Sequence, residues 1–525
     1  MDREFEPWRQ ALEEGRAEIR ARQESGASGR EIVRATSDLV DRVVIAAFER
    51  ATGARGGTEG FALAALGGYG RRELSPRSDV DLLLLHRGVL EQEARLVAER
   101  LFTPLWDVGL EVGAATRTPA ECQRIAEEDH TARTALLELR FLAGDPTVYA
   151  DLETRVLEDL AGARGDELVA AKVEETARRR ERFGGSVHLL EPDVKQSPGA
   201  LRDLQSALWI ARVRTRAAGL SALLARGVLP LREVERLRDA RDLLWRVRNT
   251  LHHLAGRRED RLTFDRQEQV AAALGYRDSP EGLAVEAFMR DYYLAAEAVR
   301  RIADDLVERC LERPPAGAAT SRPVAPGLKL WNDRLTFVSR ESLREDPSLF
   351  VRLFTVAEEL GVSIYPWARD LVREEAHRID DRLRADPRVT AALRAAFARA
   401  TRADWLRQMH REGVLGALLP EFGRVTAKHQ HDLYHVYTVD THSVFAVQRL
   451  GRLRAGELLD EERHLSHVAR EIVRPLSLSV GVLFHDAGKG LGGRHSERGA
   501  ELVRRVTERL GVSPAEAADA EFLVR

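Results

Sequence analysis

Short apolar runs separated by turn residues stand out in the first quarter of the chain. Residues 61–66 form one such run, and residues 80–85 form a second after a cluster of Gly, Arg, Pro and Ser. A third run, residues 110–116, follows a stretch of helical periodicity. Runs of this length between turn signals predict β-strands. We therefore expect a small unit of mixed α and β structure, preceded by a helical segment over residues 1–57.

The remainder of the chain has the apolar period of an α-helix, interrupted once. The period extends over residues 120–312 and resumes near residue 341. Between these parts, residues 313–327 are rich in Pro, Gly and Ala, a composition typical of a loop or linker. A chain of 525 residues is also too long for a single hydrophobic core. The pattern predicts the α+β class, with mostly helical domains after the first one.

Composition and charge describe an ordinary globular chain and narrow the range of partners. Hydrophobic residues make up 44% and charged residues 31% of the sequence. The net charge of -3 provides no overall attraction for nucleic acid, so an RNA or DNA partner is disfavoured. The two cysteines lack metal-binding spacing, and no apolar run is long enough to span a membrane. We expect a cytoplasmic protein without nucleic-acid or membrane partners.

Residues 65–85, ALGGYGRRELSPRSDVDLLLL, combine a glycine turn with two alternating carboxylates. Gly67 and Gly68 follow the first predicted strand, and Asp79 and Asp81 begin the second. The two-residue period of a strand puts both carboxylates on one face. Neighbouring carboxylates repel each other unless a cation lies between them, and their hard oxygens suit Mg²⁺. Glycines leave backbone N–H groups accessible to phosphate oxygens, so a metal-bound nucleotide is expected here.

This combination resembles the signature of polymerase-β-like nucleotidyltransferases, in which Mg²⁺ binds a nucleoside triphosphate. That fold usually carries a third carboxylate on a neighbouring strand. Glu111 is the candidate, and an ordinary surface-facing glutamate is the alternative. Arg71 and Arg72 are candidates to pair with phosphates, with solvated arginines as the alternative. The motif therefore predicts a transferase site with Asp79 and Asp81 as metal ligands.

A second run, LEPDVKQSPGALRDLQ at residues 190–205, precedes an apolar helix. By periodicity alone it is a loop, with a helix beginning near Ser197 and Pro198. Lys195 lies in this run and is one of only five lysines in the chain. It is a candidate to bind nucleotide.

Histidines gather in the last fifth of the chain. His442 precedes the run LFHDAGKG, in which His485 and Asp486 follow an apolar helix. An adjacent His-Asp pair on one helix and a His from another form the metal ligands of HD-type phosphohydrolases. Lys489 would lie on the same helical face as His485, within reach of a phosphate. A purely structural His-Asp pair is the alternative, but the upstream histidine and the following His495 favour a metal site. No role is assigned to three further histidines, His429, His431 and His435.

These runs and the segment LTFDRQ at residues 262–267 occur in the order found in bacterial PII uridylyltransferase/uridylyl-removing enzymes, which the whole chain resembles. One departure is Ala200, where that family usually has a second glycine. The resemblance implies transfer of UMP from UTP to a tyrosine of a small trimeric PII signalling protein, in nitrogen regulation. It also implies hydrolytic removal of that UMP, with Mg²⁺ at the first site and Mg²⁺ or Mn²⁺ at the second.

The resemblance gives each motif residue a role. The transferase site would use three catalytic acids, Asp79, Asp81 and Glu111. Nucleotide would be bound by Gly67, Gly68, Arg71 and Lys195. Hydrolysis would depend on His485, Asp486 and Lys489, with metal held by His442, His485 and Asp486.

Two expectations concern the C-terminal end. Members of this family usually carry small-molecule-sensing ACT domains after the HD domain, and none is expected before Arg525. Transferase activity should then not respond to glutamine. HD domains also close the metal shell with an Asp from a later helix, and residues 521–525 resemble the start of a helix that is cut short. The hydrolase is therefore expected to be weak. The remaining acids, expected to be solvated, are Glu497, Glu501, Glu508, Glu516, Asp519 and Glu521.

Three rival functions share parts of this pattern. A tRNA CCA-adding enzyme can join the same two domain types, but it needs a basic groove for RNA and lacks the run at residues 190–205. A guanosine tetraphosphate synthetase/hydrolase places its HD domain first. A catalytically inactive regulatory scaffold would have no need of the intact carboxylates and imidazoles at Asp79, Asp81, His485 and Asp486.

The predicted organisation has six segments. They are an N-terminal helical segment (1–57), a nucleotidyltransferase domain (58–170), a helical substrate- and nucleotide-binding domain (171–312), a linker (313–327), a helical connector (328–420) and a truncated HD phosphohydrolase domain (421–525).

Overall fold

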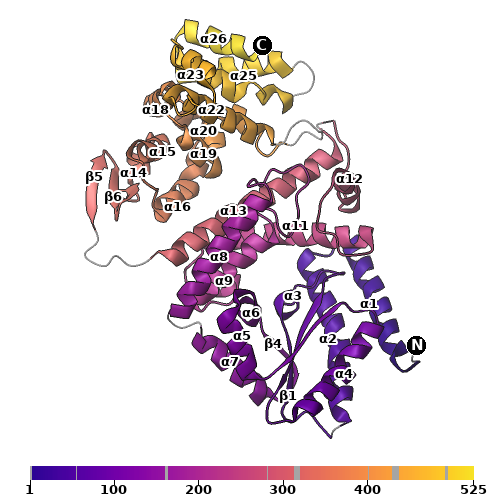
Figure 1. Cartoon of the computed structure of the whole chain (residues 1–525). Coiled ribbons are helices and arrows are strands. Elements are labelled where there is room, and N and C mark those ends of the chain that lie inside the picture. Colours follow the sequence, from indigo (N-terminus) through magenta and orange to yellow (C-terminus); the bar gives the residue numbers. More distant parts are fainter. Residues whose placement is uncertain are drawn as a thin grey trace. The chain divides into compact units, whose positions relative to one another are not determined.

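The computed structural model forms two compact units (Figure 1). The first comprises Met1–Arg277 and Asp291–Leu311, and the second comprises Asp278–Arg290 and Glu312–Arg525. Each unit contains one small sheet and its own set of helices. The described residues are 3–54, 56–159, 163–280, 282–312, 320–399, 401–428, 437–490 and 495–525.

The first unit is built around a four-stranded sheet of order β3-β2-β1-β4. Strand β1 is antiparallel to β2 and to β4, whereas β2 is parallel to β3. The three strands expected from the apolar runs are confirmed. The fourth, β4, lies in the stretch predicted to be helical; it is short and only partly buried, so its apolar signal is weak. The strands are β1 (Phe61–Ala65), β2 (Val80–His86), β3 (Val112–Arg117) and β4 (Arg140–Gly144).

Helices cover both faces of this sheet, which explains why β1 and β2 are apolar on both sides. On one face, Leu82 and Leu84 pack against α2 and α4. On the other face, Leu83 and Leu85 pack against α5 and α7. Figure 1 shows β1 and β4 between these two groups of helices.

The remaining part of the first unit is helical, as predicted for residues 171–312. Helices α8 to α13 follow one another there. The helices of the first unit, with α13 running through both units, are α1 (Glu6–Glu24), α2 (Gly29–Gly53), α3 (Gly67–Gly70), α4 (Glu91–Asp107), α5 (Pro119–Glu128), α6 (His130–Leu136), α7 (Pro146–Asp159), α8 (Ala163–Arg182), α9 (Leu201–Thr215), α10 (Leu220–Ala225), α11 (Leu231–Ala255), α12 (Phe264–Ala273) and α13 (Ala284–Leu311).

The second unit begins with a three-stranded antiparallel sheet that the sequence analysis missed. The prediction of a linker over residues 313–327 is wrong at β5 (Ser321–Ala325). This segment is a strand that pairs with β6 (Leu328–Trp331). Residues 313–319 lie outside the described residues. The expected helical connector also contains β7 (Arg334–Phe337).

The hairpin between β6 and β7 has a clear local cause. Trp331 pairs with Arg334, leaving Asn332 and Asp333 as a two-residue loop, both with positive φ of 48° and 60°. Asn and Asp tolerate this conformation better than other side chains, and it matches the twist of the flanking strands. An Asn-Asp pair between two short alternating runs predicts a turn. The helical periodicity of the surrounding sequence hid this signal.

The rest of the second unit is helical, with a core that extends from β6 to the last helix. Among the residues that the structure describes, no helix is both long and apolar enough to cross a membrane. The helices of this unit are α14 (Ser342–Glu345), α15 (Leu349–Leu360), α16 (Pro366–Glu375), α17 (Asp381–Arg384), α18 (Pro387–Ala398), α19 (Asp404–Arg411), α20 (Val414–Leu418), α21 (Pro420–Gly423), α22 (Val439–Ala455), α23 (Arg463–Arg470), α24 (Pro475–Phe484), α25 (His495–Leu510) and α26 (Pro514–Val524).

Candidate functional sites

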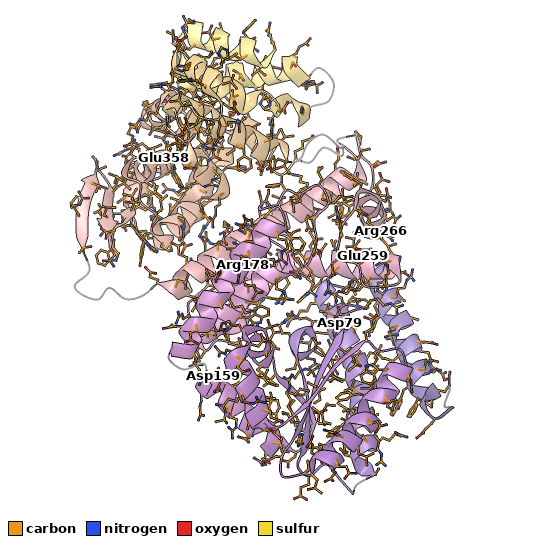
Figure 2. The ribbon with its side chains drawn as sticks, viewed as in Figure 1. Asp79, Asp159, Arg178, Glu259, Arg266 and Glu358 are labelled. Carbon is orange, nitrogen blue, oxygen red and sulfur yellow. The ribbon has the colours of Figure 1, made fainter. Side chains whose placement is uncertain are left out.

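Asp79 directly precedes β2 (Figure 2), and Asp81 is the second residue of that strand, so the two-residue period puts both carboxylates on one face of the sheet. Val80, between them, is buried with the core of the opposite face. Two glycines enclose the carboxylate of Asp81: a Cβ atom at Gly67 would lie 2.9 Å from Oδ2, and one at Gly113 would lie 2.7 Å from Oδ1. The strand therefore sets the direction of the carboxylates, and the glycines give Asp81 the space it needs.

Electrostatics at this site favour a cation. Burial, followed by the charge of Asp79, raises the pKa of Asp81, and the ammonium of Lys195 opposes that rise. Arg258 donates to Asp79, with 2.8 Å between Nη1 and Oδ2. Two close carboxylates with hard oxygens are a donor set that suits Mg²⁺, and a divalent ion would relieve their repulsion. Asp79 and Asp81 thus line the same cavity, and their role as metal ligands stays a prediction.

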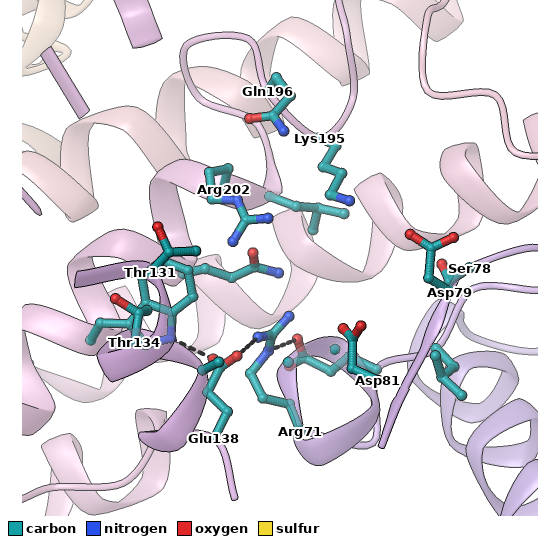
Figure 3. A pocket seen from close by; sticks show the side chains of 18 of the residues that line it. Arg71, Ser78, Asp79, Asp81, Thr131, Thr134, Glu138, Lys195, Gln196 and Arg202 are labelled. Atoms are coloured by element: carbon teal, nitrogen blue, oxygen red, sulfur yellow. Dashed lines mark hydrogen bonds and ion pairs between the residues drawn. The ribbon is translucent and has the colours of Figure 1, made fainter. Parts of the chain in front are cut away.

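A cavity of about 370 Å³ opens beside the aspartates and is lined by both acidic and basic groups. Figure 3 shows the side chains of Lys195 and Arg202 pointing into it from the side opposite Arg71 and Asp81. Gly67 and Gly68 also line this cavity. A mixed lining of this kind fits a ligand that carries several negative charges together with a bound cation.

The run at residues 190–205 is a structured loop that carries Lys195 into the cavity. The carboxylate of Asp193 accepts hydrogen bonds from the backbone N–H groups of Lys195 (2.9 Å) and Gln196 (2.6 Å). The N–H of Asp193 donates to Ser197 Oγ at 2.9 Å. Burial, followed by the neighbouring charges of Arg248 and Arg258, lowers the pKa of Lys195 to about 8. The loop geometry explains why Asp, Lys and Ser occur at this spacing.

The LTFDRQ segment supports that loop from the other side. Leu262 N–H donates to the Pro192 carbonyl at 2.9 Å, and Gln267 Nε2 donates to the Leu190 carbonyl at 2.6 Å. Phe264 N–H donates to Glu191 Oε1 at 3.1 Å. The two motifs, separated by about sixty residues of helix and loop, therefore form one folded element of the first unit.

The turn before α9 depends on a glycine and on a buried aspartate. Gly199 has φ +77°, and a Cβ atom there would lie 2.2 Å from the Ala296 carbonyl oxygen. Asp203 accepts from Gly199 N–H (2.9 Å) and from Arg179 (2.6 Å). Ala200, the departure from the family pattern, has φ −83° and is fully buried. Its conformation does not require glycine, so the departure costs no strain.

Arg71 and Glu138 form a buried pair in the wall of the cavity. The Arg71 guanidinium donates to Glu73 at 2.7 Å and also to Glu138. The indole N–H of Trp209 donates to the other oxygen of Glu138. Sequence reasoning missed Glu138, because it precedes the unrecognised strand β4. Arg71 thus already donates to two carboxylates. Its binding of phosphate stays a prediction. Arg72 pairs instead with Asp38.

Glu111 lies next to the aspartate pair but outside the main cavity. It directly precedes β3, and its carbonyl accepts a hydrogen bond from Val80 N–H at 2.8 Å. Because Gly113 pairs with Asp81, the two-residue period puts Glu111 on the same face as both aspartates. It is exposed, and with Asp79 and Asp81 it lines an open hollow. Its role as a third acid stays a prediction with compatible geometry.

The second predicted site is found in the second unit. His442 on α22 comes together with His485 and Asp486, with one ligand atom from each residue lying within 4.8 Å of the others. Within the described ranges this is the only cluster of at least three such groups. One detail differs from the prediction of a His-Asp pair within a helix: α24 ends at Phe484, and the pair follows it. His429, His431 and His435 lie outside the described residues.

Hydrogen bonds fix the orientation of His485 and Asp486. His485 Nδ1 donates to the Val482 carbonyl at 2.7 Å, and Nε2 lies 3.3 Å from Asp486 Oδ2. A metal held by the imidazole and the carboxylate would take the place of that second contact. The hydrogen bond with Asp486 raises the pKa of His485 against the effect of burial. Burial alone would raise the pKa of Asp486, but the hydrogen bonds from His485 and Lys489 hold it below its usual range. Lys489 donates to Asp486 at 2.9 Å, so its contact with phosphate stays a prediction.

Among the described residues, none of the six acids after His495 belongs to this cluster. Several have other partners: Glu501 pairs with Arg505, and Asp519 pairs with Arg474. Glu516 caps a helix through Ser513. The cluster therefore consists of two imidazoles and one carboxylate, a set that accepts divalent transition metals as well as Mg²⁺.

Comparisons with known proteins show what the chain is similar to. Residues 167–307 match the family model described as GlnD PII-uridylyltransferase, and residues 329–418 match the uridylyltransferase GlnD third domain. The bifunctional uridylyltransferase/uridylyl-removing enzyme of Azospirillum brasilense is 37% identical over 98% of this chain and 57% of its own length. The enzymes of the same name from Rhodospirillum rubrum and Pseudomonas putida are 38% and 37% identical over 98% and 92% of this chain. They are covered over 56% and 54% of their lengths, so the chain spans little more than half of these relatives. The resemblance inferred from the motifs is confirmed.

Proposed function

We propose that this chain transfers UMP from UTP to a tyrosine of a PII signalling protein, and that its second unit removes the UMP by hydrolysis. The observation that carries the transferase proposal is the pair Asp79 and Asp81 facing Lys195 and Arg202 in one cavity. Relatives named for these two activities are 37% and 38% identical to this chain over 98% of its length. The first unit would then be a polymerase-β-like nucleotidyltransferase, and the second would carry an HD-type phosphohydrolase.

The forward reaction is a displacement at the α-phosphorus of UTP. The tyrosine oxygen forms the new bond to phosphorus as the bond to the bridging oxygen of the β-phosphate breaks, and pyrophosphate leaves with that electron pair. Glu111, on the same face as the aspartates, accepts the hydroxyl proton. Asp79 and Asp81 would hold Mg²⁺, which would neutralise negative charge at the transferring phosphate. The chain's own basic groups, Lys195 first among them, bind the remaining negative charge.

The reverse reaction is hydrolysis of the tyrosine–UMP phosphodiester, with water as the nucleophile. The side chains of His442, His485 and Asp486 would hold Mg²⁺ or Mn²⁺, which makes a water nucleophilic near neutral pH. The Nδ1–H bond of His485 to the Val482 carbonyl fixes the ring so that Nε2 faces the cluster. Lys489 donates to Asp486, and the flexible stem of its side chain would let the ammonium turn to a phosphate oxygen instead.

The pairing of opposed activities fits a regulator of nitrogen metabolism in the cytoplasm, with PII as the protein partner. The test is incubation of the 525-residue chain with α-labelled UTP, Mg²⁺ and purified PII. Label should enter wild-type PII, and a PII variant with phenylalanine at the acceptor tyrosine should remain unlabelled. Transfer from ATP or CTP at a rate equal to that from UTP would contradict the proposed donor. Absence of transfer from every nucleotide would contradict the proposed reaction.

A further inference from the structure

Arg202 is a cavity-lining cation that the motif analysis did not assign. It lies in the first turn of α9, and its backbone N–H donates to the Lys195 carbonyl at 2.9 Å. Its guanidinium lies over the ring of Trp209, 5.3 Å from the centroid. In the part of the chain that the structure describes, no carboxylate lies within ion-pair distance of it. The ammonium of Lys195 likewise has no carboxylate partner there.

The acids near Arg202 are already engaged by other donors. One oxygen of Glu138 accepts from Arg71, and the other accepts from the Trp209 indole. Glu175 accepts from Lys172 at 2.6 Å. The arrangement therefore provides each of these acids with a partner and leaves the five N–H donors of Arg202 for a ligand.

A guanidinium in this position is unfavourable without an anion. Burial, followed by the positive charge of Arg71, lowers the pKa of Arg202 to about 10. Folding nevertheless holds the side chain in place, because Gly199 and Asp203 fix the turn that begins α9. A buried charge without a counter-charge costs free energy, and an incoming anion would recover that cost as binding energy.

We propose that Arg202, together with Lys195, binds the β- and γ-phosphates of the nucleoside triphosphate and stabilises the pyrophosphate that leaves. The inference rests on the proposed function and adds to it a residue for the leaving group. The planar fork of a guanidinium matches two phosphate oxygens at once, which an ammonium cannot do. As the α-phosphorus–oxygen bond breaks, the electron pair moves onto pyrophosphate, and the negative charge that grows there faces Arg202 and Lys195.

A purely structural role for Arg202 makes a different prediction about stability. If the guanidinium served to hold the fold through Trp209, its removal would lower the unfolding temperature. If it serves to bind an anion, then Arg202→Met removes an uncompensated, half-buried charge and keeps the apolar stem. The unfolding temperature of Arg202→Met should then equal or exceed that of the wild type.

The experiment measures binding of inorganic pyrophosphate, with Mg²⁺ present, by calorimetry to the full 525-residue chain and its variants. Arg202→Met should bind pyrophosphate at least about tenfold more weakly than wild type, the loss expected for a hydrogen-bonded ion pair. Arg202→Lys, which keeps the charge without the fork, should lie between them. Arg178→Met is the matched control, since Arg178 is exposed on α8 and pairs with Glu174 at 3.6 Å (Figure 2). Its affinity should equal that of the wild type.

The outcomes separate this inference from the proposed function. Equal affinity of wild type and Arg202→Met, no pyrophosphate binding by wild type, or a lowered unfolding temperature of Arg202→Met would each overturn the role of Arg202. UMP transfer by the wild-type chain would leave the proposed function standing in all three cases. Conversely, a loss of pyrophosphate binding in Arg202→Met without UMP transfer by the wild type would support the phosphate site and reject the transferase.

Discussion

The two candidate sites of this protein differ in the charge that surrounds their metal ligands. In the first unit, Asp79 and Asp81 face two cations, Lys195 and Arg202, that have no acidic partner among the described residues. In the second unit, the cluster consists of two imidazoles and one carboxylate, and Lys489 is already bonded to that carboxylate, Asp486. Under the proposed function, the first arrangement would bind several phosphates, whereas the second would bind a metal and its water.

This difference indicates why one chain would need two separate sites for opposite reactions. Transfer must hold a triphosphate and stabilise a pyrophosphate leaving group, which requires positive charge beyond the metal. Hydrolysis of a phosphodiester has a smaller anion to hold, and its main requirement is a water nucleophile beside a divalent metal. Each site has the charges that its proposed reaction needs, so variants at one site should leave the other reaction intact.

The largest effect is expected at the transferase aspartates. Asp81→Asn removes one of two metal-binding charges and should lower UMP transfer by about a thousandfold or more. Hydrolysis of PII that has been uridylylated beforehand should stay near the wild-type rate. The substitution also relieves repulsion with Asp79, so the unfolding temperature should not fall. Equal loss of both activities would indicate a shared site or a folding defect.

The converse variant tests the second site. Asp486→Asn removes the only carboxylate of the cluster and should weaken metal binding there by about 10- to 100-fold, with a corresponding loss of hydrolysis. UMP transfer should be unchanged, and label transfer to PII in the same preparation provides the control. A fall in transfer that matches the fall in metal binding would break the separation between the two sites.

Two neighbouring positions test how the turn that begins α9 is built. Gly199→Ala places a Cβ atom against the Ala296 carbonyl in a left-handed conformation, so it should destabilise the chain by roughly 2–4 kcal/mol. Ala200→Gly restores the family residue where φ is −83°, and should change stability by no more than about 1 kcal/mol. Chemical denaturation of both variants measures the contrast. Equal effects would show that the turn does not depend on Gly199.

The smallest effect concerns pH. The lowered pKa of Lys195, about 8, means that its ammonium is charged below that pH and loses its proton as pH rises through it. The kcat/KM for UTP should therefore fall above pH 8, by up to about tenfold per unit. Lys195→Arg keeps its charge throughout this range, so its falling limb should move to higher pH. If kcat/KM falls over the same pH range in both proteins, the group that titrates is not Lys195.

The sequence predicted the parts of both sites that depend on local spacing. Alternation along one strand was enough to put Asp79 and Asp81 on one face. The HD context was enough to associate His442 with His485, more than forty residues away. Glu138 and Arg202 could not be found in this way, because their roles follow from which distant donors and acceptors already have partners.

The limits of the fold prediction have a similar cause. Strand β4 is short and partly buried, and its existence depends on pairing with β1, which lies far earlier in the chain. The hairpin of β6 and β7 is local, and the pair Asn332-Asp333 marks its turn. Helical periodicity in the surrounding sequence outweighed that signal. Local patterns thus predicted most helices and three strands of the first sheet, whereas long-range pairing determined the rest.

The most direct test of two separate metal-dependent sites is a titration of the purified chain with Mn²⁺, followed by electron paramagnetic resonance of the free ion. The wild type should bind Mn²⁺ at two independent sites. Asp81→Asn and Asp486→Asn should each lose one, and the double variant should lose both. A wild type with a single site, or single variants that each lose all binding, would contradict the account.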